Sequence, residues 1–161
     1  MKLLTLSTVL LLLSACGESP PPPQNGEPPP AFELALLHGG STRFPEDYPQ
    51  RLVAIRFWAD WCPFCESEMR ALEPVFEKYR EQGLTILAVN VRQDRDTAAA
   101  FIRKLGVGYP TLLDEDGAVA RRYGVLGLPT TYFVDRDGRL IGKIIGESTP
   151  QMFLSMLEGR L

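Results

Sequence analysis

The sequence predicts an α/β fold in which helices flank a mixed central β-sheet, with a β-hairpin as an N-terminal extension. Apolar stretches with strand periodicity alternate with amphipathic stretches between residues 52 and 134. This β-α-β-α order is typical of parallel strand pairs covered by helices on both faces. A second pair of strands, joined by a turn at residues 135–138, adds antiparallel pairing. The 161 residues are 45% hydrophobic, which is enough for one domain with one core.

Local signals place the elements along the chain. Gly39-Gly40 indicates a turn between the first two strands. Pro63 suits the first position of a helix, Gly83 suits its end, and Asp96 is expected to cap the next helix. We expect strands at 32–36, 42–44, 52–58, 85–91, 111–113, 130–134 and 140–145, and helices at 63–82, 97–105, 118–123 and 150–158.

The first thirty residues are predicted to lie outside the fold. The apolar run from Leu3 to Leu13 is typical of a signal peptide and is too short for a membrane-spanning helix. The small residues before Cys16 resemble a bacterial lipoprotein box, in which the cysteine is lipidated. We expect a signal peptide at 1–15, a lipid-anchored proline-rich tether at 16–30 and a folded domain at 31–161. This arrangement predicts an extracytoplasmic, periplasmic-side protein anchored to a bacterial membrane.

The two remaining cysteines, Cys62 and Cys65, form a Cys-x-x-Cys pair. A disulfide between residues three apart closes a very small loop and removes little entropy from the unfolded chain, which favours a redox role over a structural one. The pair lies between a predicted strand and a predicted helix, with Cys62 at the helix N-cap. Because a helix N-terminus favours the thiolate, we expect Cys62 to be an exposed nucleophile and Cys65 to be the less exposed resolving thiol.

The residues around this pair resemble the active site of the thioredoxin superfamily. Residues 57–65 read Phe-Trp-Ala-Asp-Trp-Cys-Pro-Phe-Cys, and residues 127–131 read Gly-Leu-Pro-Thr-Thr. The resemblance implies a thioredoxin-like fold in which Pro129 is cis and packs against the cysteines, so that the main chain of Leu128 faces an extended substrate strand. More narrowly, the chain resembles the TlpA/ResA/CcmG group of membrane-tethered bacterial reductases, which have a redoxin-type domain.

Two charged residues near the cysteines leave alternatives open. Glu68 lies one turn beyond Cys65, where ResA-like proteins place an acid, so it either shuttles a proton to or from Cys65 or is a solvated helix residue. Arg56 stands where ordinary thioredoxins hold a buried aspartate. By strand alternation it points away from Val53, Ile55 and Phe57. Arg56 either tunes the thiolate, with Glu68 or Asp60 as its partner, or extends to the surface.

The resemblance implies a disulfide reductase that takes electrons from a membrane thiol donor and passes them to exported proteins with disulfides, with apocytochrome c as the leading client. Trp61 and Pro63, which flank Cys62, are expected to bind the substrate. No cofactor is expected. A metal site is not expected either, because two thiolates are half a structural zinc site and His38 is the only histidine.

Other function classes remain as alternatives. An oxidase or isomerase would use the same site, and the direction depends on the potentials of the partners. A thiol peroxidase shares the fold, but Ala59 stands where that group has a threonine. A non-catalytic, redox-linked binding module is the third alternative. The formal net charge of −3, with no long run of either sign, gives no indication of nucleic-acid binding, and we expect a monomer.

Overall fold

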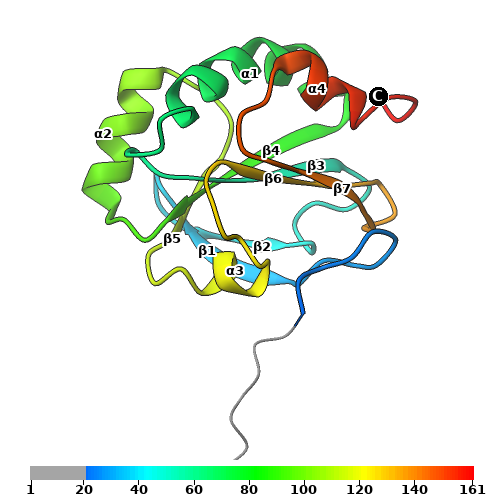
Figure 1. Ribbon diagram of the computed structural model, residues 1–161, viewed down its shortest axis with the longest axis horizontal. Helices are drawn as coiled ribbons and strands as arrows, with labels where there is room; N and C mark the ends of the chain where they lie inside the picture. Colours follow the sequence, from blue (N-terminus) through cyan, green and yellow to red (C-terminus); the bar gives the residue numbers. More distant parts are fainter. Residues whose placement is uncertain (1–20) are drawn as a thin grey trace, which may run out of the picture.

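The computed structural model describes residues 21–161, so the predicted signal peptide and Cys16 lie outside the described residues. A seven-stranded sheet in the order β2-β1-β5-β4-β3-β6-β7 forms the centre of the molecule (Figure 1). The strands are β1 (Phe32–Leu36), β2 (Ser41–Phe44), β3 (Leu52–Trp58), β4 (Leu84–Val91), β5 (Thr111–Asp114), β6 (Thr130–Val134) and β7 (Leu140–Ile145). The helices are α1 (Cys65–Tyr79), α2 (Arg95–Leu105), α3 (Ala118–Arg122) and α4 (Pro150–Ser155), with a short 3₁₀ helix, η1 (Arg80–Gln82), after α1.

The sheet is mixed, as predicted. β3 pairs in parallel with β4, and β4 pairs in parallel with β5. β6 and β7 extend the other side with antiparallel pairing. The predicted N-terminal hairpin, β1 and β2, joins the sheet because β1 pairs antiparallel with β5. The two central strands, β3 and β4, are buried along their whole length, as their apolar sequences require.

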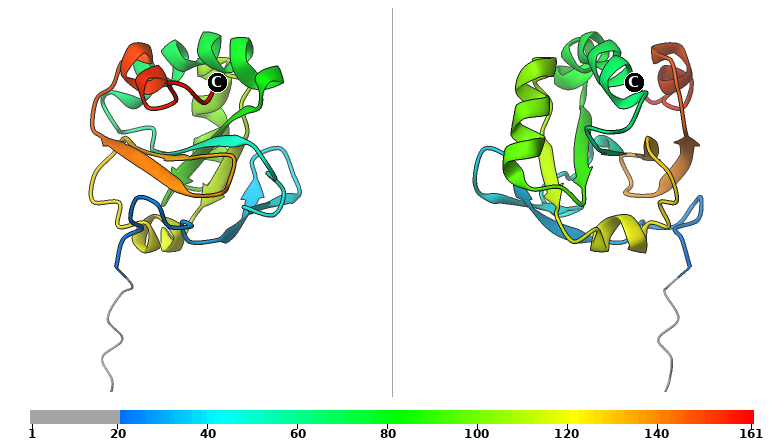
Figure 2. Two further views of the ribbon diagram at one scale, coloured as in Figure 1. Left: turned by 90° about the vertical axis from the view of Figure 1, so that its right-hand side faces the viewer. Right: turned by 60° about the vertical axis from the view of Figure 1, so that its left-hand side comes forward.

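The core forms two clusters, one on each face of the sheet. α1, α2 and α4 supply apolar side chains to one cluster, whereas α3 and the leading hairpin supply the other. Figure 2 shows the same division, with α1, α2 and α4 on one side of the sheet and α3 on the opposite side. Both cysteines belong to the cluster beneath α1. The reactive pair therefore lies on the side of the sheet covered by three helices.

Several helix boundaries differ from the predicted ones. α1 begins at Cys65, because Pro63 lies in a turn and the helical hydrogen bonds start with the Glu68 N–H donating to the Phe64 carbonyl. Asp94, not Asp96, caps α2: its carboxylate accepts the Thr97 N–H at 2.8 Å, and Asp96 lies inside the first turn. At the C-terminal end, α4 stops at Ser155, ahead of the predicted end at residue 158.

The proline-rich segment contacts the domain closer to the N-terminus than expected. The Gly26 N–H donates to the Leu140 carbonyl at 2.8 Å, and the Leu140 N–H donates to the Glu27 carbonyl at 2.9 Å. The Tyr123 hydroxyl donates to the Pro30 carbonyl at 2.7 Å. β7 is an edge strand, so the N–H and C=O of Leu140 at its start have no neighbouring strand and pair with Glu27 and Gly26. The expected boundary at residue 31 is therefore too late, since residues 26–30 are bound to the fold.

Between residues 21 and 161, no helix combines the length and the apolar character needed to cross a membrane.

We predict that Tyr123→Phe lowers the free energy of unfolding by about 1 kcal/mol, because the Pro30 carbonyl loses a hydrogen-bond donor. Urea denaturation measures this change. Hydrogen exchange at the Gly26 amide should also become faster than in the parent protein. Tyr48→Phe is the control, because its hydroxyl pairs with Thr42 far from this segment and its loss should leave Gly26 protected. An unprotected Gly26 amide in the parent protein would contradict the docked arrangement.

Candidate active site

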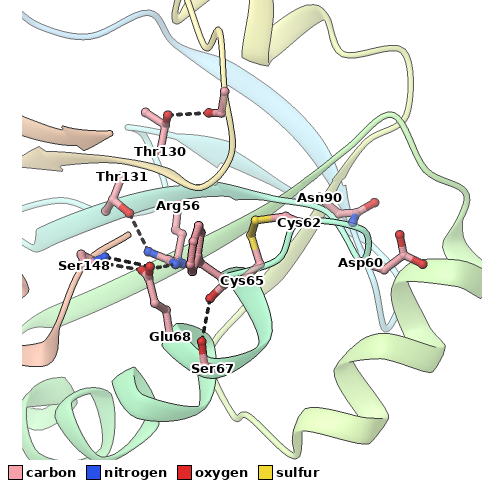
Figure 3. The surroundings of a disulfide bond; sticks show 12 residues. Arg56, Asp60, Cys62, Cys65, Ser67, Glu68, Asn90, Thr130, Thr131 and Ser148 are labelled. Atoms are coloured by element: carbon pink, nitrogen blue, oxygen red, sulfur yellow. Dashed lines mark hydrogen bonds and ion pairs between the residues drawn. A yellow bond between two sulfur atoms is a disulfide. The ribbon is translucent and has the colours of Figure 1, made fainter. Parts of the chain in front are cut away.

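A disulfide joins Cys62 and Cys65 at the junction of β3 and α1 (Figure 3). Two consecutive tight turns produce this geometry. The Cys62 N–H donates to the Ala59 carbonyl at 3.2 Å, and the Cys65 N–H donates to the Cys62 carbonyl at 3.2 Å. The two Cα atoms are 5.4 Å apart, within the usual range for a disulfide. The sequence thus predicted both the pairing and its place after a central strand.

Cys62 differs from the expectation in two respects. The N-cap of α1 is Phe64, so Cys62 precedes the cap by two residues. In this disulfide form Cys62 is only 3% exposed, so the expectation of an exposed sulfur is wrong for the oxidised state. Cys65 is 0% exposed, so the expected order of accessibility is found. Because Cys65 is the first residue of α1, the disulfide holds both sulfurs at the positive end of the helix, which favours a thiolate there after reduction.

Pro129 follows a cis peptide bond, as the resemblance implied. Its carbonyl accepts the Gly146 N–H at 2.8 Å, and the hydroxyl of Thr130 donates to the Gly127 carbonyl at 2.7 Å. These bonds fix both ends of the loop that carries Leu128. Within residues 21–161, the N–H and C=O of Leu128 form no hydrogen bond. The side chain of Leu128 packs against both core clusters, one of which contains the two cysteines, and Leu128 lines the same groove as Trp61, the residue before Cys62.

A buried ion pair lies on one side of the disulfide. The Arg56 Nη2 donates to Glu68 Oε2 at 2.6 Å, and Arg56 and Glu68 are 1% and 5% exposed. Ser148 donates twice to the same carboxylate at 2.7 Å, from its N–H to Oε1 and from its hydroxyl to Oε2. The Arg56 Nη1 also donates to the Thr131 hydroxyl at 3.0 Å. Both open alternatives are thereby decided: Arg56 lies inside the protein with Glu68 as its partner, and Glu68 is not a solvated residue.

A second polar cluster lies on the other side of the disulfide, as Figure 3 shows for Asp60 and Asn90. The Asp60 N–H donates to Gln93 Oε1 at 3.0 Å, and the Gln93 amide nitrogen donates back to the Asp60 carboxylate. Asn90, which is buried at the end of β4, donates to the same Gln93 oxygen at 2.8 Å. This cluster fixes the loop before Cys62, and it leaves Asp60 engaged away from Arg56.

Sequence reasoning did not identify Ser148, Thr131, Asn90 or Gln93 as members of the site. Ser148 is 80 residues from Glu68, and no periodicity relates two residues at that separation. The Asn90 position offered a signal, since it places an amide side chain near the end of a mostly apolar strand.

A groove of about 360 Å³ opens beside Trp61, the residue that precedes Cys62. Trp61, 69% exposed, and Leu126, 100% exposed, stand along it, and Leu128 links it to the loop before Pro129. Pro63 is exposed in the turn between the cysteines. The remaining lining residues are mostly apolar but include two arginines: Val91, Arg92, Gly117, Ala120, Arg121, Val125 and Gly127. Trp61 and Leu128, two of the expected substrate-binding residues, are therefore brought to one surface.

In the part of the chain that the structure describes, no group of three or more histidine, cysteine or acidic side chains is placed to hold a metal ion.

Comparison with known proteins identifies relatives along most of the chain. Residues 25–142 match the family model described as the AhpC/TSA family. The chain is 35% identical over 129 residues to the thiol-disulfide oxidoreductase ResA of Geobacillus thermodenitrificans, which covers 80% of this chain and 74% of that protein. It is 30% identical, over the same shares, to ResA of Bacillus thuringiensis.

Solved structures agree with this relationship. A Chlorobium tepidum protein, assigned as the thiol:disulfide interchange protein DsbE, is 27% identical with a TM-score of 0.76, over 84% of this chain and 99% of that one. A secreted disulfide oxidoreductase of Mycobacterium tuberculosis, described as homologous to DsbE of E. coli, is 26% identical with a TM-score of 0.67, over 80% and 92% of the two chains.

We predict that iodoacetamide alkylates Cys62 of the reduced protein at least about tenfold faster than Cys65, because Cys62 is the more accessible sulfur and its thiolate is favoured at the helix end. Peptide mass spectrometry at neutral pH measures the two rates. In denaturant the rates should converge, since the difference depends on the fold. Equal rates in the folded protein would contradict the assignment of Cys62 as the nucleophile.

Proposed function

The chain belongs to the AhpC/TSA family of the thioredoxin superfamily and is a thiol–disulfide oxidoreductase, and from this premise we propose that it reduces disulfides of exported proteins. The observation that carries the proposal is the Cys62–Cys65 disulfide together with a Leu128 main chain that forms no hydrogen bond within residues 21–161 and lines the same groove as Trp61. A redox-active dithiol and a place for an extended client strand thus occur together.

The reaction requires only the two sulfurs. The Cys62 thiolate attacks one sulfur of a client disulfide, which forms a mixed disulfide and releases the other client sulfur as a thiol. The Cys65 thiolate then attacks Cys62, which releases the second client thiol and restores the Cys62–Cys65 disulfide. Two electrons pass to the client in each cycle. A membrane thiol donor is proposed to return the two electrons to the protein.

The groove gives the client a second point of contact. An extended segment paired with the Leu128 main chain would place a neighbouring side chain over Trp61 and Leu126. An apolar client side chain fits this lining, and such segments are more accessible in clients that are not yet folded. Apocytochrome c is one client of this kind and is the one we propose to test first.

Membrane attachment is part of the proposal. A lipid on Cys16 would hold the domain at an extracytoplasmic membrane surface, where a donor in the membrane can reach it. Since Gly26 is bound to β7, residues 17–25 would form the spacer, which spans at most about 30 Å at about 3 Å per residue. Labelling with radioactive palmitate, lost in Cys16→Ala, tests the lipid.

The opposite direction of transfer is the main alternative. Pro63 stands first between the cysteines, as in strongly oxidising relatives. A reduction potential on the order of −180 to −250 mV agrees with the proposed reductase, whereas a potential near about −120 mV would favour an oxidase.

We predict that the protein catalyses insulin reduction by dithiothreitol and that Cys62→Ser abolishes this turnover, because no mixed disulfide can form. Cys65→Ala should also stop turnover, but it should accumulate mixed disulfides because the resolving sulfur is absent. Identification of trapped clients in the native host then names the substrates. Full insulin turnover by Cys62→Ser would refute the reductase proposal.

We predict that Leu126→Ala raises KM for a protein client severalfold, since about 1 kcal/mol or more of apolar contact is lost from the groove. Reduction of a small disulfide such as glutathione disulfide should not change, because it does not extend into the groove. Met152→Ala is the matched control, as it removes a partly exposed apolar side chain from α4, away from the groove. Equal effects on large and small substrates would argue against a client groove.

A further inference from the structure

The buried pair of Arg56 and Glu68 is adjacent to the resolving cysteine. Glu68 lies one turn after Cys65 on α1, and the two side chains share a helix face. Arg56 lies between Ala54 and Trp58 on β3, and both of these neighbours belong to the same core cluster as Cys65. Figure 3 shows Arg56, Glu68 and Ser148 gathered on one side of the disulfide. The two opposite charges therefore occupy the protein interior next to the reacting sulfurs.

In the part of the chain that the structure describes, Arg56 and Glu68 form the ion pair that is buried beside the disulfide. Asp60 is held by Gln93 on the other side of the disulfide. Tyr109, the other titratable group near Arg56, is neutral at neutral pH because burial raises its pKa. Ser148 donates both its N–H and its hydroxyl to Glu68, so the carboxylate is held against Arg56 from the loop before α4. Within the described residues, every hydrogen bond of the Glu68 carboxylate therefore comes from Arg56 or Ser148.

We propose that Arg56, Glu68 and Ser148 act as a charge-balancing unit that keeps either buried charge from shifting the reduction potential of the Cys62–Cys65 disulfide. Arg56 favours a thiolate in the reduced form, and Glu68 cancels most of that effect. Ser148 is a positioning residue that keeps the carboxylate on the guanidinium. In this arrangement Glu68 serves as the counter-charge of Arg56 and not as a proton carrier for Cys65. This inference deepens the proposed function and rests on it for its biological meaning, but the potential itself requires no client.

The two charges have opposite effects when they are removed one at a time. Glu68→Gln leaves the positive charge of Arg56 unbalanced, which stabilises the thiolate and therefore the reduced form. Arg56→Gln leaves the negative charge of Glu68 unbalanced, which destabilises the thiolate. A role limited to folding would lower stability in both variants and would not move the potential in opposite directions.

The test is redox equilibration of the full-length protein with glutathione buffers at neutral pH. We expect Glu68→Gln to shift the equilibrium about tenfold toward the dithiol, which is about 30 mV toward more oxidising values, and Arg56→Gln to shift it by a similar factor the other way. Glu66→Gln and Arg70→Gln are the matched controls: they remove the same charges from the solvent side of α1, where water screens them, and should leave the potential unchanged.

Ser148 is tested in the same assay. Ser148→Ala should shift the potential in the direction of Glu68→Gln by a smaller factor, because the carboxylate is held less firmly on Arg56. Ser148→Thr keeps the hydroxyl and should restore the parent value. An unchanged potential in Ser148→Ala would overturn the positioning role.

A double variant keeps the proposal falsifiable if a single variant does not fold. Arg56→Met with Glu68→Gln removes both charges together and should return the potential to within about threefold of the parent equilibrium constant. Shifts in the same direction for the two single variants, or a tenfold shift in the double variant, would overturn the charge balance. Insulin turnover by Cys62→Ser tests the proposed function separately, so the two failures are distinguishable.

Discussion

A charge buried in the centre of the sheet requires a compensating partner, and this requirement organises the site. Arg56 points from a strand that is buried along its whole length, so its guanidinium has no access to water. Removing one member of such a pair typically costs about 3–5 kcal/mol, because the other charge stays buried without a partner. Arg56 is bound by Glu68 from α1 and by Thr131 from β6, and Glu68 is bound in turn by Ser148 from the loop before α4. Elements that are distant in the sequence thereby converge beside the disulfide.

The polar contacts on the two sides of the disulfide have complementary effects. The Arg56–Glu68 pair holds the first turn of α1, whereas Gln93 holds the loop that carries Asp60. The main chain of Leu128, on the groove that begins at Trp61, forms no hydrogen bond within residues 21–161. Its N–H and C=O are therefore left for a partner, as an exchange reaction with an extended client requires.

The docked proline-rich segment has a consequence for how the domain sits near a membrane. Proline-rich sequence cannot form a core, but its carbonyl groups remain strong acceptors. Tyr123 and the first residue of β7 use these groups, so the chain leaves the domain at a defined position beside the edge strand. A lipid anchor ahead of this segment would therefore be linked to the domain at a fixed point beside β7.

The amino-acid sequence by itself determined the strands, the mixed sheet and the Cys62–Cys65 pair, since these follow from local periodicity and from residues close together in the chain. The resemblance to the thioredoxin superfamily, and not a local pattern, implied the cis bond before Pro129. Strand alternation also gave the face of β3 on which Arg56 lies. Only the tertiary structure decided how deep Arg56 is, which acid is its partner and that Ser148 completes the pair. Burial and pairing depend on segments up to 80 residues apart, and no local pattern encodes such contacts. The same reason explains Asp94: two nearby aspartates could cap α2, and the main-chain conformation at the end of β4 selected one.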